Sequence, residues 1–118
     1  MKKLFALLAV LAMPAYADRF SVPKNALFEE ECGACHLAFP PQLLHADSWR
    51  AMMGGLAQHF GVDASLAADR RVAITDFLVA HAGGRKAGAT RDSRGQTLLR
   101  ITDTAYFKKE HREIAVAT

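Results

Sequence analysis

The amino-acid sequence predicts an all-α domain of about four helices. In two segments, residues 49–60 and 66–81, apolar side chains recur at the spacing that gathers them on one face of a helix. Residues that commonly cap helices precede these segments, and prolines and glycines separate them. We find no internal repeat and no low-complexity tract, so we expect one domain with irregular connections.

The first two helices follow from their caps and breakers. Asn25 can cap a helix over residues 26–31, whose glutamates suit the positive end of the helix dipole. Proline lacks the N–H that a helix needs, so residues 40–41 interrupt the chain. The second helix is expected to begin at Asp47 or Ser48 and to end at Gly61. Its apolar face comprises Trp49, Met52, Met53, Leu56 and Phe60.

The second half of the chain predicts two further helices. The third begins at Asp63 or Ser65 and ends at residues 83–84, which are both glycine. Its apolar stripe comprises Leu66, Ile74, Phe77, Leu78 and His81. Residues 83–96 contain four glycines and several basic residues, which predicts a flexible, solvated loop. The last helix is expected from residue 102 or 103 to about residue 114.

The N-terminus has the features of a secretory signal peptide over residues 1–17. Lys2 and Lys3 precede an apolar run, Leu4–Met13, that is too short to span a bilayer. A small-x-small pattern predicts cleavage after Ala17 and export to the periplasm. The net charge of +3 falls to +1 once the two leader lysines are removed. Residues 18–118 thus form one nearly neutral domain, and nothing indicates a nucleic-acid partner.

One pentapeptide, Cys32-Gly33-Ala34-Cys35-His36, carries the functional signal. Its C-x-x-C-H pattern is typical of c-type haem attachment. The two thiols can add across the two vinyl groups of one haem, and His36 is then placed to coordinate the iron. The sequence therefore predicts a small c-type cytochrome domain folded around one covalent haem c, most simply an electron carrier rather than an enzyme.

The cysteine pair has three other possible uses. A zinc site needs four ligands and usually a second paired motif, but the chain has two cysteines in all. A thioredoxin-like pair needs a βαβ context, and no strand-rich stretch flanks this one. A simple disulfide remains an alternative. The adjoining His36 and the export signal favour haem.

The far side of the iron can take His, Met or no ligand. We choose His59, which lies three residues beyond Leu56 and borders the apolar face of the second helix. Two glycines one turn earlier, Gly54 and Gly55, would leave room for a flat macrocycle to approach the backbone.

Other ligands remain open from the residues alone. His81 is the serious rival, because it continues the apolar stripe of the third helix. His111 lies among charged residues, and His45 lies in a loop after the prolines. The remaining candidates, Met52 and Met53, fit core packing better than ligation.

The chain resembles the dihaem cytochrome c family of exported bacterial electron carriers. The attachment motif is common to many cytochromes, and the Ser-Trp-Arg and His-Phe-Gly segments are the more specific features. The matching segments are Glu31–His36, Phe39-Pro40-Pro41 with Leu44, Ser48-Trp49-Arg50, Met53–Leu56, His59-Phe60-Gly61, Ala64-Ser65-Leu66, Arg100-Ile101-Thr102 with Tyr106-Phe107, and His111–Ile114.

The resemblance implies a small helical domain with two haems, each with His on both iron faces. It implies electron transfer, with a membrane-bound cytochrome b and a small oxygen-binding cytochrome c as partners, and peripheral membrane contact. On this pattern His36 and His59 match the ligands of one haem, whereas His81 falls on no family motif.

The sequence departs from the family pattern near its end. The family places a second C-x-x-C-H shortly after the segment that matches His111–Ile114, and the sequence printed here ends at Thr118. We therefore expect either a one-haem variant or a shortened dihaem chain. His111 would then be the idle far ligand of a lost second haem, or it would replace His59 at the remaining one. The alternative to electron transfer is a haem with an open sixth position that binds a small gas or catalyses a redox reaction.

Overall fold

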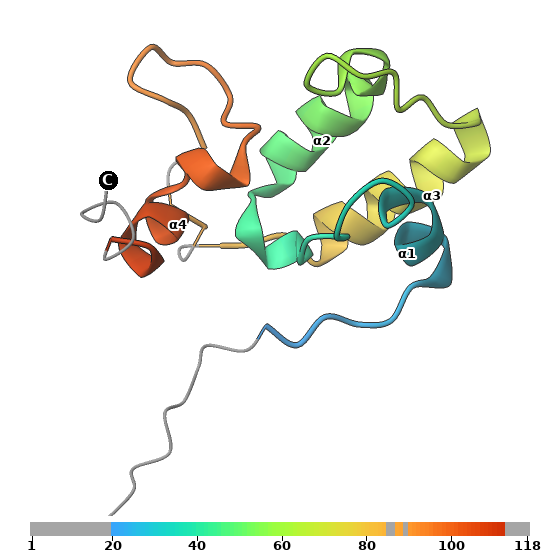
Figure 1. Ribbon diagram of the computed structural model, residues 1–118, viewed down its shortest axis with the longest axis horizontal. Helices are drawn as coiled ribbons and strands as arrows, with labels where there is room; N and C mark the ends of the chain where they lie inside the picture. Colours follow the sequence, from blue (N-terminus) through green and yellow to red (C-terminus); the bar gives the residue numbers. More distant parts are fainter. Residues whose placement is uncertain (1–19, 85–86, 89, 113–118) are drawn as a thin grey trace, which may run out of the picture.

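The computed structural model describes residues 20–84, 87–88 and 90–112 (Figure 1). This part of the chain is helical, with four α-helices, short 3₁₀ turns and no β-strand, so the predicted fold class is confirmed. The proposed signal peptide, residues 1–17, lies outside the described residues. Among the described helices, none combines the length and the apolar character needed to cross a membrane.

Helix α1, Ala26–Cys32, begins where the sequence predicts. The Asn25 side chain accepts a hydrogen bond from the backbone N–H of Phe28, at 2.9 Å, which satisfies a donor that the helix cannot satisfy itself. The helix extends one residue beyond the expected end, so Cys32 belongs to its last turn.

Helix α2, Ala46–Gly54, is shorter than expected. His45 occupies the N-cap position without a side-chain capping bond, so neither Asp47 nor Ser48 caps the helix. The helix ends at Gly54 rather than Gly61, because two successive glycines favour leaving helical geometry and Gly55 adopts φ −115°. A 3₁₀ turn, η2 (Leu56–Gln58), follows. The residues that were expected to extend the helix therefore form a separate connection.

Helix α3, Ala68–Ala80, begins later than expected. The carboxylate of Asp63 accepts a hydrogen bond from the backbone N–H of Ser65, at 2.9 Å. This local bond competes with helix formation, so the segment stays outside the helix. The C-terminal end agrees with expectation, since His81 is the C-cap and two glycines follow.

Helix α4, Ala105–Glu110, follows another 3₁₀ turn, η4 (Ile101–Asp103). Its cap is Thr104, whose hydroxyl accepts from the backbone N–H of Phe107 at 3.2 Å, so the prediction of residue 102 or 103 was wrong. The same hydroxyl donates to the carbonyl of Ile101 at 2.7 Å. Residues 113–118 lie outside the described part, and so does the expected end of this helix.

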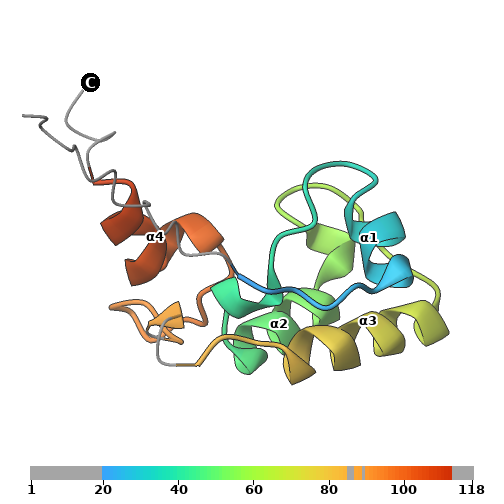
Figure 2. The same cartoon turned by 90° about the horizontal axis from the view of Figure 1, so that it is seen from below.

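Helices α1, α2 and α3 pack together, and α4 lies to one side of them (Figure 2). Their shared core consists of Phe28, Leu44, Trp49, Met53, Ile74 and Leu78. The indole N–H of Trp49 donates to the carbonyl of Pro41 at 2.8 Å, within the 3₁₀ turn η1 (Pro41–Leu43). This bond fixes the connection that leads from the attachment motif into α2.

The connection over residues 83–96 is more ordered than a solvated loop, at least where it is described. Ala87 is buried, and the carboxylate of Asp92 accepts from the backbone N–H groups of Arg94 and Gln96. Residues 85, 86 and 89 lie outside the described part. The prediction therefore needs correction for the residues around Ala87 and Asp92.

Candidate haem site

The attachment motif starts at the C-terminal end of α1. Cys32 packs against the hydrophobic core and is half-buried, whereas Cys35 and His36 are exposed. Both cysteines are free thiols, so no disulfide joins Cys32 to Cys35 in the structure. Two free thiols therefore lie at the edge of the helical group, with Cys32 packed against the core and Cys35 exposed.

An ion pair holds the helix that delivers Cys32. The guanidinium of Arg70, in the first turn of α3, contacts the carboxylates of Glu31 and Glu30 in α1.

Burial, and secondly the negative charge of Glu31, raise the pKa of the Cys32 thiol. This thiol is therefore protonated at neutral pH, since both causes disfavour the thiolate.

His36 follows the second cysteine and is oriented by its own neighbour. Its Nδ1 donates a hydrogen bond to the carbonyl of Leu37 at 2.8 Å. A carbonyl can only accept, so Nδ1 carries a proton, and in the neutral ring Nε2 is left with a free lone pair. A hydrogen bond from one ring nitrogen is typical of histidines that bind a metal through the other nitrogen.

His59 stands outside any helix, on a tight turn. Its backbone N–H donates to the carbonyl of Val62 at 2.9 Å, and the N–H of Val62 returns a bond of 3.1 Å. The two residues between them have positive φ, 49° at Phe60 and 88° at Gly61. Positive φ at both central residues defines a type I′ turn. The turn, rather than an amphipathic face, presents His59.

The rings of His36 and His59 are neighbours in nearly parallel planes, with centroids 6.2 Å apart and planes inclined by 21°. Their separation is wider than that of the stacked rings of Phe107 and His111, whose centroids are 3.9 Å apart. A metal–imidazole bond of about 2 Å, plus about 1.1 Å from nitrogen to ring centre, places two rings on one metal about 6 Å apart. The pair therefore has the separation that one haem iron requires.

The electrostatics of the pair suit ligation as well. Burial, and secondly the charge that His36 carries when its ring is protonated, lower the pKa of His59. A lowered pKa favours the neutral imidazole, which is the form that binds a metal.

Exposed apolar side chains also cluster in the sequence around the two histidines, and a flat apolar group would cover such side chains well. They are Leu37, Phe39, Phe60 and Val62.

The other candidate histidines are placed differently. His81 and His111 each donate from Nδ1 to the carbonyl four residues earlier, at 2.8 Å, and each packs against the aromatic ring at that position. His45 hydrogen-bonds the carbonyl of Gly88. In the described part, the aromatic neighbours of the His36 ring are Phe39 and His59. Ligation by His59 stays a prediction, but it is the histidine that the fold brings to His36.

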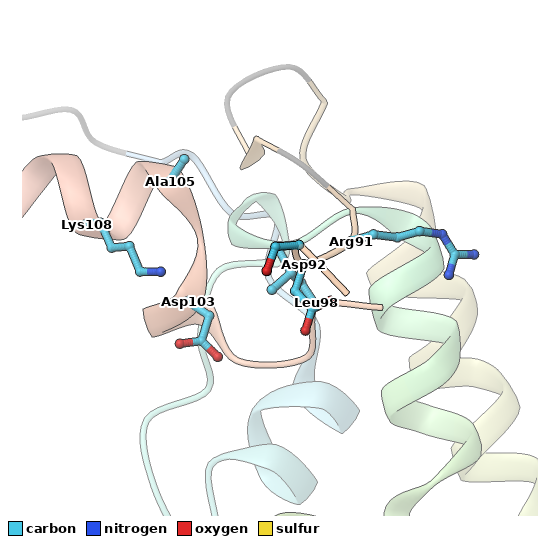
Figure 3. Close-up of a pocket in the computed structure, with 7 residues that line it drawn as sticks. Arg91, Asp92, Leu98, Asp103, Ala105 and Lys108 are labelled. Carbon is cyan, nitrogen blue, oxygen red and sulfur yellow. The ribbon is translucent and has the colours of Figure 1, made fainter. Parts of the chain in front are cut away.

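Two further features bear on cofactor binding. Among the described residues, no group of three or more His, Cys, Asp and Glu is arranged to hold a bare metal ion, and the zinc alternative gains no support. An open cavity of about 500 Å³ lies between the segment around Asp92 and helix α4 (Figure 3). Its lining mixes Arg91 and Lys108 with Asp92 and Asp103 and includes none of the predicted haem ligands.

Sequence reasoning missed two residues beside His59. The ring of Phe60 lies 4.9 Å from the imidazole of His59, and the guanidinium of Arg100 lies 4.4 Å from the centre of the Phe60 ring. Phe60 had been assigned to an apolar helix face, yet it is 45% exposed. The compact His-Phe-Gly segment was a signal for Phe60, but no local pattern points to a contact forty residues away.

Comparison with known proteins identifies the family to which the chain belongs. The model of the family described as dihaem cytochrome c matches residues 28–118. The chain belongs to the dihaem cytochrome c family. No match was found among the curated proteins. Family membership associates the chain with c-type haem and with haem-based electron transfer. It is consistent with an electron-transfer protein rather than an enzyme.

Three solved dihaem cytochromes c resemble the structure. One from Rhodobacter sphaeroides is 44% identical, with a TM-score of 0.64, covering 79% of this chain and 75% of that one. A second from the same organism is 41% identical, with a TM-score of 0.69 and coverages of 78% and 76%. One from Shewanella baltica OS155 is 40% identical, with a TM-score of 0.62 and coverages of 79% and 65%.

Proposed function

We propose that this dihaem cytochrome c family member is a periplasmic electron carrier. In this proposal Cys32 and Cys35 hold one haem c through thioether bonds, and His36 and His59 coordinate its iron from opposite faces. The observation that carries the proposal is the pair of imidazoles 6.2 Å apart, one of which adjoins the two thiols.

Each residue of the site would have a defined task. A bound haem supplies a one-electron couple between ferric and ferrous iron. Cys32 and Cys35 would fix the position of the macrocycle, so the haem would stay attached independently of the two histidines. The Leu37 carbonyl orients His36 and makes its imidazole a better donor. Two imidazoles suit both oxidation states, so electron transfer requires little rearrangement of the chain.

Localisation and partners form part of the same proposal. A leader with the features of residues 1–17 supports export and cleavage after Ala17. The family resemblance supports a membrane cytochrome b and a small oxygen-binding cytochrome c as redox partners, with peripheral membrane contact. Cell fractionation tests the location: recovery of a red, shortened protein in the periplasm is expected, and recovery in the cytoplasm would exclude it.

Covalent attachment is tested by expressing the chain in a host with cytochrome c maturation proteins. The purified protein should keep its red colour after extraction with acid and acetone, because thioether bonds survive this step. Ser in place of both Cys32 and Cys35 should release or prevent the haem. The pyridine haemochrome absorbance per chain should correspond to one haem, and a colourless protein after extraction would refute the proposal.

Electron transfer is tested by redox titration of the same protein. A reversible one-electron transition is expected, with low-spin spectra in both oxidation states and no rapid reaction of the reduced form with carbon monoxide. A high-spin ferric form that binds carbon monoxide readily would instead favour the gas-binding or redox-catalytic alternative. The two outcomes are distinguished in one optical experiment.

A further inference from the structure

His59 differs from the other histidines in how its ring is held. The rings of His36, His81 and His111 each donate from Nδ1 to a backbone carbonyl, and the ring of His45 bonds the carbonyl of Gly88. Within the described residues, the imidazole of His59 makes no such bond. Histidines that bind a metal are nearly always oriented by a hydrogen bond from the second nitrogen. If His59 binds the iron, another contact has to orient its ring.

The neighbouring aromatic ring is the first part of the answer. Phe60 packs against the imidazole of His59, with centroids 4.9 Å apart and planes inclined by 59°. Its backbone has φ 49°, a region that residues other than Gly, Asn and Asp rarely adopt. A smaller polar residue would fit this turn with less strain, and the side chain is 45% exposed. Neither the backbone nor core packing explains a phenylalanine here, whereas contact with His59 does.

Arg100 is the second part. Its guanidinium carbon lies 4.4 Å from the centre of the Phe60 ring, a cation–π distance. Arg100 immediately precedes η4, where Ile101 packs against the hydrophobic core. The Thr104 hydroxyl holds that turn by donating to the Ile101 carbonyl. Arg100 is therefore attached to a turn that packs against the core, and its guanidinium lies over the ring of Phe60.

We propose that Phe60 and Arg100 act as positioning residues for His59, as a clamp that replaces the missing hydrogen bond. The inference rests on the proposed function, because it assigns His59 to the sixth position of the haem iron. In this arrangement Arg100 holds Phe60, and Phe60 restricts rotation of the imidazole. Loss of either residue should let His59 leave the iron more often while leaving the haem covalently attached.

The test compares variants of the mature haem protein. In Arg100→Ala and Phe60→Asn we expect cyanide to replace the sixth ligand of the ferric form about tenfold faster, which matches the lower end of the loss in metal affinity or activity when residues supporting a ligand are removed. Asn tolerates a left-handed backbone, so Phe60→Asn keeps the turn and removes only the ring. Arg100→Lys retains the charge without the planar guanidinium, and we expect an intermediate rate.

Arg94→Ala is the matched control. It removes an exposed arginine whose partner is the neighbouring Asp92, and it should leave the cyanide rate unchanged. Thermal unfolding followed by circular dichroism separates a local effect from general loss of structure: Phe60→Asn should melt no lower than the wild type while reacting faster. If Arg100→Ala and Phe60→Asn react at the rate of Arg94→Ala, the clamp is refuted. A wild-type protein without a low-spin haem would refute the proposed function instead.

Discussion

The type I′ turn that presents His59 predicts a specific cost for one substitution. Gly61 has φ 88°, and a Cβ atom added there would meet no other atom within 4 Å. Gly61→Ala therefore causes no clash, and the whole penalty comes from the left-handed backbone. For residues with a Cβ this penalty is about 1–2 kcal/mol. The variant should lose that much free energy of unfolding.

Gly54→Ala is the control for this measurement. Gly54 is the last residue of α2, has no positive φ, and would likewise direct its new Cβ into open space. Alanine at a compatible position stabilises by about 0.4–1 kcal/mol, because the unfolded chain loses freedom. Two identical chemical changes, seven residues apart, are thus expected to have opposite signs.

Thermal unfolding of the mature protein, followed by far-ultraviolet circular dichroism, provides the assay. The two variants should differ by about 2 kcal/mol, which for a domain of this size corresponds to roughly 8–16 °C between their midpoints. Gly61→Ala should melt below the wild type and Gly54→Ala above it. Equal midpoints for the two variants would show that the turn geometry assigned to His59 is wrong.

Three further predictions follow from single contacts. Asn25→Ala should lose about 1 kcal/mol of unfolding free energy in urea titration, since it removes the α1 cap, and an unchanged midpoint would exclude that cap. Ile74→Ala should cost about 2–5 kcal/mol because Ile74 is fully buried, whereas Val72→Ala, on the exposed side of α3, should stay within about 0.5 kcal/mol. The side-chain and backbone hydrogen bonds of Ser65 lower the pKa of Asp63 from 3.8, so the ionised carboxylate stabilises the folded state. This contribution to the free energy of unfolding is complete above pH 3.8 and is lost as the pH falls through the folded-state pKa. Asp63→Asn should therefore melt below the wild type at pH 7, and the difference should narrow in acid; a difference independent of pH would contradict the assignment.

The sequence predicted the features that depend on neighbouring residues. The attachment motif is local chemistry, since five consecutive residues supply both thiols and the near ligand. Asn25 acts as a cap through a bond that spans three residues, and it was identified correctly. The stripe of α3 was also visible, because Ile74 and Leu78 both point into the core at helical spacing.

The remaining features depend on contacts that are distant in the sequence. Leu56 and Phe60 continue the apolar period of α2, so periodicity alone extended the helix past the glycines that end it. Only the folded chain shows that Phe60 has a positive φ and that Arg100 lies over its ring. His59 was chosen for its place on a helix face, and the structure brings it to His36 through a turn instead.

The central claim is that His36 and His59 flank one iron. Electron paramagnetic resonance of the ferric mature protein, recorded for the wild type, His59→Ala and His111→Ala, tests it most directly. A low-spin bis-imidazole signal is expected for the wild type and for His111→Ala, and a high-spin signal for His59→Ala. A low-spin signal that survives His59→Ala and disappears in His111→Ala would contradict the claim.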